Sequence, residues 1–87
     1  MPTATHAFLR RLRAAARCIQ AGTPPDIPGL LEALESWSSA MPVPRARILT
    51  LIQGARNDLA SPLPAAALSH LSSAIEIVER VQKQGGP

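Results

Sequence analysis

The sequence predicts an all-α protein, a small four-helix bundle built from two helical hairpins joined by proline-rich turns. Apolar residues recur at steps of three and four in four separate segments, as they do on one face of an α-helix. Clusters of proline and glycine divide these segments. At 87 residues the chain has room for one domain, 1–87, and either hairpin alone would leave an apolar stripe in water.

The first predicted helix spans about residues 5–21, with Thr5 as a candidate N-cap and Gly22 as a candidate stop signal. Its apolar stripe, which Leu9 and Ala16 widen, consists of Phe8, Leu12, Ala15 and Ile19. The opposite flank carries three arginines and no acid: Arg10, Arg13 and Arg17. This spacing predicts a helix that turns its apolar side to a core and its charges to water.

The second predicted helix spans about residues 27–40 and follows TPPDIPG, where the prolines stop the first helix and Asp26 can cap the next. Its apolar face consists of Leu30, Leu31, Leu34 and Trp37. Glu32 and Glu35 lie on the other side, where we expect them to face the basic flank of the first helix.

The third predicted helix spans about residues 44–60, with Pro44 in its first turn. Its stripe consists of Ile48, Leu51, Ile52, Ala55 and Leu59. Gly54 lies inside this helix, where glycine costs about 1 kcal/mol relative to alanine. A close crossing with a neighbouring helix at Gly54 would explain this choice.

The fourth predicted helix spans about residues 62–83, with Ser61 as N-cap and Pro62 at the first helical position. Its inward-facing residues are predicted to be Leu68, Leu71, Ile75 and Val78, widened by Ile77 and Val81. Acid-before-base pairs four residues apart, Glu76 with Arg80 and Glu79 with Lys83, indicate a solvated outer face. Residues 84–87 are expected to form a disordered tail.

The composition indicates a thin core. Hydrophobic residues make up 46% of the chain, but 15 of them are alanines and only Phe8 and Trp37 are aromatic. Since burial contributes roughly 25 cal/mol per Å² of apolar surface, such a core is marginally stable alone. A partner, or a second copy in a homodimer, would stabilise it.

Most catalytic and metal chemistry lacks the residues that it needs here. The single cysteine, Cys18, forms neither a disulfide framework nor a zinc site, and His6 and His70 have no carboxylate spaced to complete a metal site. We find no Gly-rich phosphate loop and no nucleophile, base and acid pattern. The sequence therefore predicts no enzyme, no cofactor and no metal. With no apolar run of roughly 18 residues and no secretory signal, it also predicts a soluble, cytoplasmic protein.

His70 invites comparison with phosphotransfer proteins, which present a histidine from a helix of a four-helix bundle. The lysine and glycine that follow that histidine are replaced here by Ser72, Ser73 and Ala74. Its helical position predicts an edge or solvent location, as for an ordinary surface histidine.

Two alternatives concern the arginines, eight in all against one lysine. Residues 1–22 are Arg-rich, acid-poor and amphipathic, as are mitochondrial targeting segments. A DNA-binding transcriptional regulator could use the basic faces of the first and third helices, the latter through Arg45, Arg47 and Arg56. Base-reading side chains on the third helix are limited to Gln53 and Asn57.

The function that the sequence favours is a small non-catalytic protein–protein interaction module: an adaptor, chaperone, inhibitor or regulatory subunit. We expect an apolar surface between helices to receive a partner helix or a second copy. The expected contact residues are Trp37, Leu30, Leu34, Ile77 and Val81. Arg10, Arg13 and Arg17 would steer an acidic partner. The preference for alanine, arginine and proline over lysine and asparagine is typical of GC-rich bacterial genomes.

Overall fold

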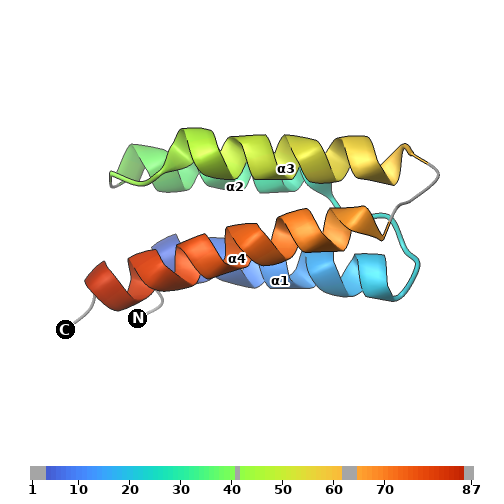
Figure 1. Ribbon diagram of the computed structural model, residues 1–87. Coiled ribbons are helices and arrows are strands. Elements are labelled where there is room, and N and C mark those ends of the chain that lie inside the picture. Colours follow the sequence, from blue (N-terminus) through green and yellow to red (C-terminus); the bar gives the residue numbers. More distant parts are fainter. Residues whose placement is uncertain (1–3, 41, 62–64, 86–87) are drawn as a thin grey trace.

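A computed structural model describes residues 4–40, 42–61 and 65–85, and all regular structure in these ranges is helical (Figure 1). The four helices are α1 (Ala4–Gln20), α2 (Ile27–Ala40), α3 (Arg45–Leu59) and α4 (Ala66–Gly85). The all-α four-helix prediction is confirmed, and α1, α2 and α3 agree with the expected ranges to within one residue.

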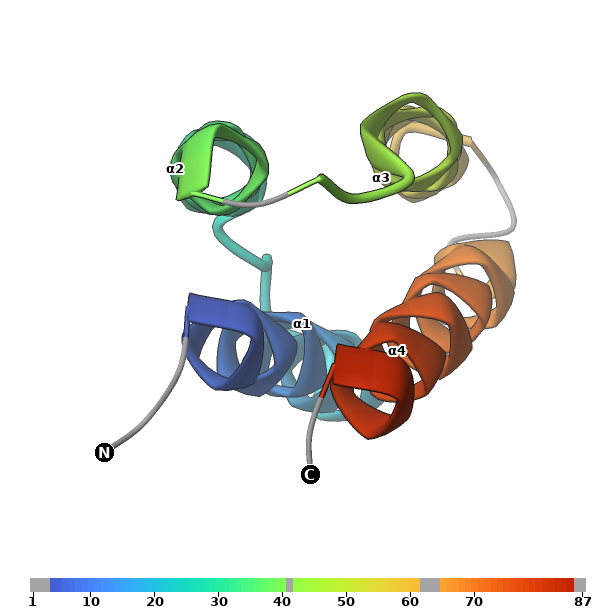
Figure 2. The same ribbon diagram turned by 90° about the vertical axis from the view of Figure 1, so that its left-hand side faces the viewer.

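The helices occupy the four corners of an up-and-down bundle, which Figure 2 shows end-on. Helix α1 packs against α2 and α4, and α3 packs against the same two neighbours. The α3–α4 interface is the most extensive and the α2–α3 interface the sparsest. Antiparallel packing places the start of α1, the end of α2, the start of α3 and the end of α4 at one end of the bundle (Figure 1).

Helix α1 ends in a Schellman motif at Gly22. The backbone N–H of Thr23 donates to the carbonyl of Cys18 at 2.8 Å, and the N–H of Gly22 donates to the carbonyl of Ile19 at 3.1 Å. Gly22 has a φ of +79°, a left-handed conformation that glycine adopts without a steric penalty. The stop signal expected at Gly22 is therefore confirmed.

Helix α2 begins with the predicted aspartate cap. The Oδ1 of Asp26 accepts a hydrogen bond from the N–H of Gly29 at 3.1 Å, which satisfies one of the free donors of the first turn. The carboxylate also approaches Gly29 so closely that a Cβ there would lie 2.3 Å from Oδ2. Glycine at position 29 therefore leaves room for the cap.

Helix α4 differs from its predicted range at both ends. It begins at Ala66 rather than at 62, and the Ser61 hydroxyl donates to the carbonyl of Asp58 at 2.7 Å. Pro62 lies outside the described residues. A second proline in the sequence, at 64, disfavours a helical conformation of the residue before it and is a signal for a later helix start. Residues 84 and 85, expected in a disordered tail, are the last residues of α4; the rest of that tail lies outside the described ranges.

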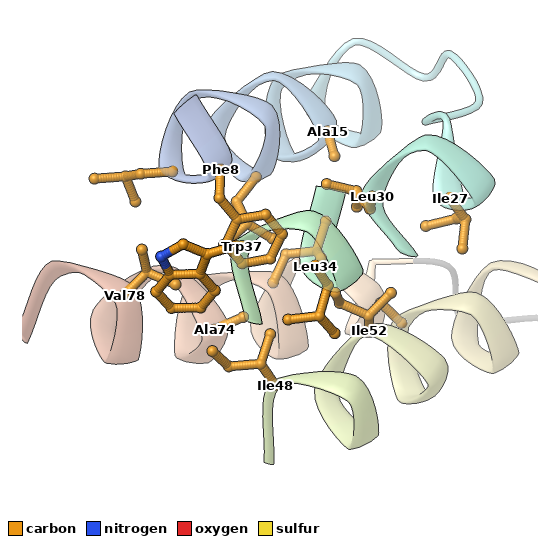
Figure 3. Packing of buried hydrophobic residues seen from close by; sticks show 14 of the residues in the cluster. Phe8, Ala15, Ile27, Leu30, Leu34, Trp37, Ile48, Ile52, Ala74 and Val78 are labelled. Carbon is orange, nitrogen blue, oxygen red and sulfur yellow. The ribbon is translucent and has the colours of Figure 1, made fainter. Parts of the chain in front are cut away.

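The core fills the space between all four helices (Figure 3). Its largest fully buried side chains are those of Trp37, Phe8, Leu9, Leu12, Leu34, Ile48, Ile52, Leu71 and Val78. Both aromatic residues belong to it, and their rings stack with centroids 4.9 Å apart and an interplanar angle of 25°. The predicted stripes of α1, α2 and α3 thus supply most of the hydrophobic core.

Thr5 has a different role from the one predicted. It lies inside α1, is only 4% exposed, and accepts a hydrogen bond from the Nε1 of Trp37 at 2.9 Å. Because an unpaired indole N–H would be costly in a buried site, this contact allows the ring to lie in the core. It also ties the first turn of α1 to the last turns of α2.

Candidate partner-binding groove

Three of the five predicted contact residues are part of the core and are not on the surface. Leu30, Leu34 and Trp37 are 2%, 0% and 1% exposed. These side chains are therefore not exposed in this fold, and their contact with a partner stays a prediction. The reason for this burial is that a core with only two aromatic residues needs Trp37 to fill the space beside Phe8.

The other two predicted contact residues lie at the margin of the core. Ile77 and Val81 are half-buried and pack against the fully buried residues. Val81 lies in the last turns of α4, whereas Ile77 reaches the edge of the α3–α4 interface. Ile77 therefore lines a groove as a half-buried side chain, whereas Trp37 and Leu30 line hollows between α1 and α2 although they are almost fully buried.

This groove runs between α3 and α4 and has a volume of about 430 Å³. We call it the α3–α4 groove and define it by its lining residues: Arg47, Thr50, Leu51, Ser73, Glu76, Ile77 and Arg80. Leu51 from α3 and Ile77 from α4 are its two large apolar side chains, and both are half-buried. Polar and charged side chains surround them, so the groove has an apolar centre and a polar rim.

Five of its residues were not predicted to bind a partner. Leu51 was assigned to the inward stripe of its helix, but it lies on the side of that stripe nearest α4. The sequence pattern predicts a solvated pair for Glu76 and Arg80 and indicates no binding role for Thr50 or Ser73. A helical wheel places Leu51 about 60° from Ile48, which is the signal that could have indicated a marginal position.

The arginines of the groove have no charged partner among the described residues. The ion pairs of this part of the chain join Arg13 to Glu79 at 2.9 Å and Arg45 to Glu35, and a further contact joins His70 to Asp58. Arg47 and Arg80 are in none of them, and neither is Glu76. The groove therefore has two unpaired cations and one unpaired anion at its rim.

The basic flank of α1 lies on the surface, but it does not face α2 as expected. Arg10, Arg13 and Arg17 are all exposed, and Arg13 pairs with Glu79 of α4. Glu35, one of the two acids expected opposite this flank, pairs with Arg45 of α3 instead. The reason is the rotation of α1 about its own axis, which turns the flank that carries Arg13 towards α4.

The arginines predicted for the DNA-binding alternative do not share one face of α3. At about 100° per residue, Arg56 lies about 20° from Arg45, whereas Arg47 lies about 160° from it. The contacts agree, since Arg45 pairs with Glu35 of α2 and Arg47 lines the α3–α4 groove. A single DNA duplex would not meet all three side chains on one surface.

His70 of α4 packs against α3 at Gly54. A Cβ built on Gly54 would lie 3.0 Å from both Cδ2 and Nε2 of the imidazole, which confirms the close crossing expected at this glycine. On the other side of the ring, Nδ1 lies 2.5 Å from the Oδ2 of Asp58, and neither of these buried atoms forms a hydrogen bond within the described chain. Both ring nitrogens therefore face α3, unlike those of a histidine presented to a phosphodonor.

Further hollows lie elsewhere in the described part of the chain. Two lie between α1 and α2, with volumes of about 320 and 140 Å³; Arg11 borders both, and half-buried Cys18 borders the smaller. A third, about 680 Å³, lies at the end of the bundle between the α1–α2 turn and Leu59, Ala65 and Leu68. No group of three metal-ligating side chains occurs among the residues that the structure describes.

Comparisons with known proteins do not assign the chain to a family, since no family model, no curated protein and no solved structure matches it. Within the described residues, no helix combines the length and the apolar character needed to cross a bilayer.

Proposed function

We propose that this chain is a small non-catalytic protein–protein interaction module that binds its partner in the α3–α4 groove. The observation that carries the proposal is the position of Leu51 and Ile77. These two large apolar side chains meet in one groove, and each remains half-buried after the core is complete.

Burying such side chains is favourable, because apolar surface gains roughly 25 cal/mol per Å² when it leaves water. An apolar centre with a polar rim is also the common anatomy of protein interfaces. In this groove the rim consists of Arg47, Thr50, Ser73, Glu76 and Arg80.

A partner would also compensate for the thinness of the core. Four of the fifteen buried hydrophobic residues are alanines, which bury little surface each. The aromatic side chains of the core are the stacked pair Phe8 and Trp37. Binding to the folded state adds to its stability by mass action. An adaptor, chaperone, inhibitor or regulatory subunit fits this description, and a second copy of the chain is one partner that the experiment must distinguish.

The test is site-specific photo-cross-linking with p-benzoylphenylalanine in cells of the native host. Ser73 lines the groove and its neighbour Ser72 is exposed outside it, so the two adjacent serines form a matched pair. On α3, Thr50 in the groove is matched by exposed Gln53 outside it. We expect adducts of defined mass from positions 50 and 73 and none from 53 and 72.

The mass of each adduct separates a second copy from a different protein. Changing Leu51 and Ile77 together to glutamine should remove the adducts, whereas Leu31→Gln, at a half-buried position of α2, should not. Equal cross-linking from all four positions, or none from any, contradicts the proposal.

A further inference from the structure

We infer that the α3–α4 groove selects an amphipathic helix with acidic residues beside its apolar stripe. This inference rests on the proposed function and names the chemistry of the partner. It comes from the charges at the groove rim and from the first turn of α3.

The first turn of α3 is electrostatically unfavourable in the chain alone. It contains Arg45 and Arg47, no acidic residue, and no side-chain hydrogen bond from the N-cap Pro44. A helix N-terminus carries partial positive charge, so cations there are destabilising and anions stabilising. Two arginines at this place are the reverse of the usual pattern.

The chain neutralises only one of these two arginines. Arg45 pairs with Glu35 on the α2 side, whereas Arg47 points to the α3–α4 groove and has no carboxylate partner in the described chain. Across the groove, Arg80 of α4 is likewise unpaired. The two positive charges of Arg47 and Arg80 and the negative charge of Glu76 give the rim a net charge of +1. A carboxylate supplied by the partner near Arg47 and Arg80 would relieve this excess.

The shape of the groove favours a helix as the occupant. Its walls are two packed helices whose lining residues recur at three- and four-residue steps: 47, 50 and 51 on α3, and 73, 76, 77 and 80 on α4. Ridges of a third helix fit grooves with this spacing. Its apolar residues at i, i+3, i+4 and i+7 would cover Leu51 and Ile77, and its flanking acids would reach the arginines.

The experiment compares two synthetic 18-residue helical peptides with the same leucine stripe. One carries glutamate at the positions flanking the stripe, and the other carries lysine at the same positions. Binding to the intact chain is measured by fluorescence anisotropy. We expect the glutamate peptide to bind about tenfold more tightly, because the lysine peptide meets like charges, and we expect the difference to shrink as salt is raised.

Charge reversal at Arg47→Glu with Arg80→Glu should invert this preference. The matched control, Arg10→Glu with Arg17→Glu, makes the same change of net charge on exposed residues of α1 and should leave the preference unchanged. Circular dichroism verifies that each variant folds.

Failure of this inference is distinguishable from failure of the proposed function. Equal binding of both peptides, lost on changing Leu51 and Ile77 to glutamine, would overturn the acidic-helix inference and leave the groove as a docking site. Binding of neither peptide overturns the inference, and the cross-linking result then decides the function. A preference that follows the α1 variants instead would assign recognition to the basic flank of α1.

Discussion

The indole Nε1 of Trp37 donates a hydrogen bond to the hydroxyl of Thr5 at 2.9 Å, and both residues are at most 4% exposed. The pair joins residues 32 positions apart and closes the core where α1 begins and α2 ends. Trp37 is therefore a core residue whose one polar atom is satisfied inside the chain.

Thr5→Val should destabilise the fold by about 1–3 kcal/mol, because it removes the acceptor and leaves a buried indole N–H unpaired while it keeps the side-chain shape. Urea denaturation followed by tryptophan fluorescence measures the loss. Thr5→Ser keeps the hydroxyl and should retain most of the stability. A valine variant as stable as the serine variant would show that this hydrogen bond contributes little.

The close approach of Gly54 to His70 makes a second prediction, for a double-mutant cycle. Gly54→Ala gains helix propensity, about 1 kcal/mol, but its Cβ would lie 3.0 Å from the imidazole and push it from its place beside Asp58. In a His70→Ala background the obstacle is gone. We expect Gly54→Ala to stabilise the His70→Ala variant by about 1 kcal/mol and the natural chain by clearly less.

Thermal and urea unfolding of the four proteins supply the cycle. The same effect of Gly54→Ala in both backgrounds would mean that His70 moves aside without cost and that the crossing is not tight.

The Asp26 cap makes a third prediction. Asp26→Ala removes the acceptor of the Gly29 N–H and should cost about 1 kcal/mol, since a first-turn donor loses its partner. Asp26→Asn retains an oxygen in the same place and should lower the stability by only a few tenths of a kcal/mol. Amide hydrogen exchange at Gly29 should become faster in the alanine variant alone. Unchanged exchange there would contradict the cap.

The four helices were predictable because their signals are local. The periodic spacing around Phe8, Ile48 and Leu71, together with Gly22 and Asp26 at helix ends, depends only on neighbours in the sequence. Such signals decide where a helix is and which side is apolar. These local signals do not determine towards which neighbouring helix the apolar side is rotated.

Helix α4 shows this limit. Leu68 and Ile75 were predicted to face inward, yet they are half-buried, and the fully buried positions include Ala67 and Ala74. Because alanines allow helices to approach closely, α4 buries Ala67 and Ala74 together with Leu71 and Val78, and this rotation leaves Leu68 and Ile75 at the margin. A hydrophobicity pattern does not separate these two rotations, since alanine counts weakly in both.

The candidate site was less predictable than the fold for the same reason. Trp37, the only large aromatic besides Phe8, was expected at the surface because it suits a binding hot spot, but the same size makes it the best filler for a thin core. Only the packing of four helices decides between the two roles. Arg47 and Arg80 meet in one groove although 33 positions separate them, a juxtaposition that no local pattern contains.

The distribution of arginines on α3 makes a last prediction, about nucleic acid. Arg45 is paired with Glu35 and Arg47 lies on the opposite side of the helix from Arg56, so the chain lacks a continuous basic surface on α3. We expect no duplex-DNA binding at about 0.15 M salt and only weak, sequence-independent retention at lower salt. Changing Arg45, Arg47 and Arg56 together to alanine should reduce this weak retention no more than changing Arg10, Arg13 and Arg17. Electrophoretic mobility shifts over a salt series measure both.

Tight binding that disappears only with the α3 substitutions would instead support a DNA-binding regulator. It would also mean that α3 reorients against α2 on the duplex, because Arg45, Arg47 and Arg56 lie on different sides of α3.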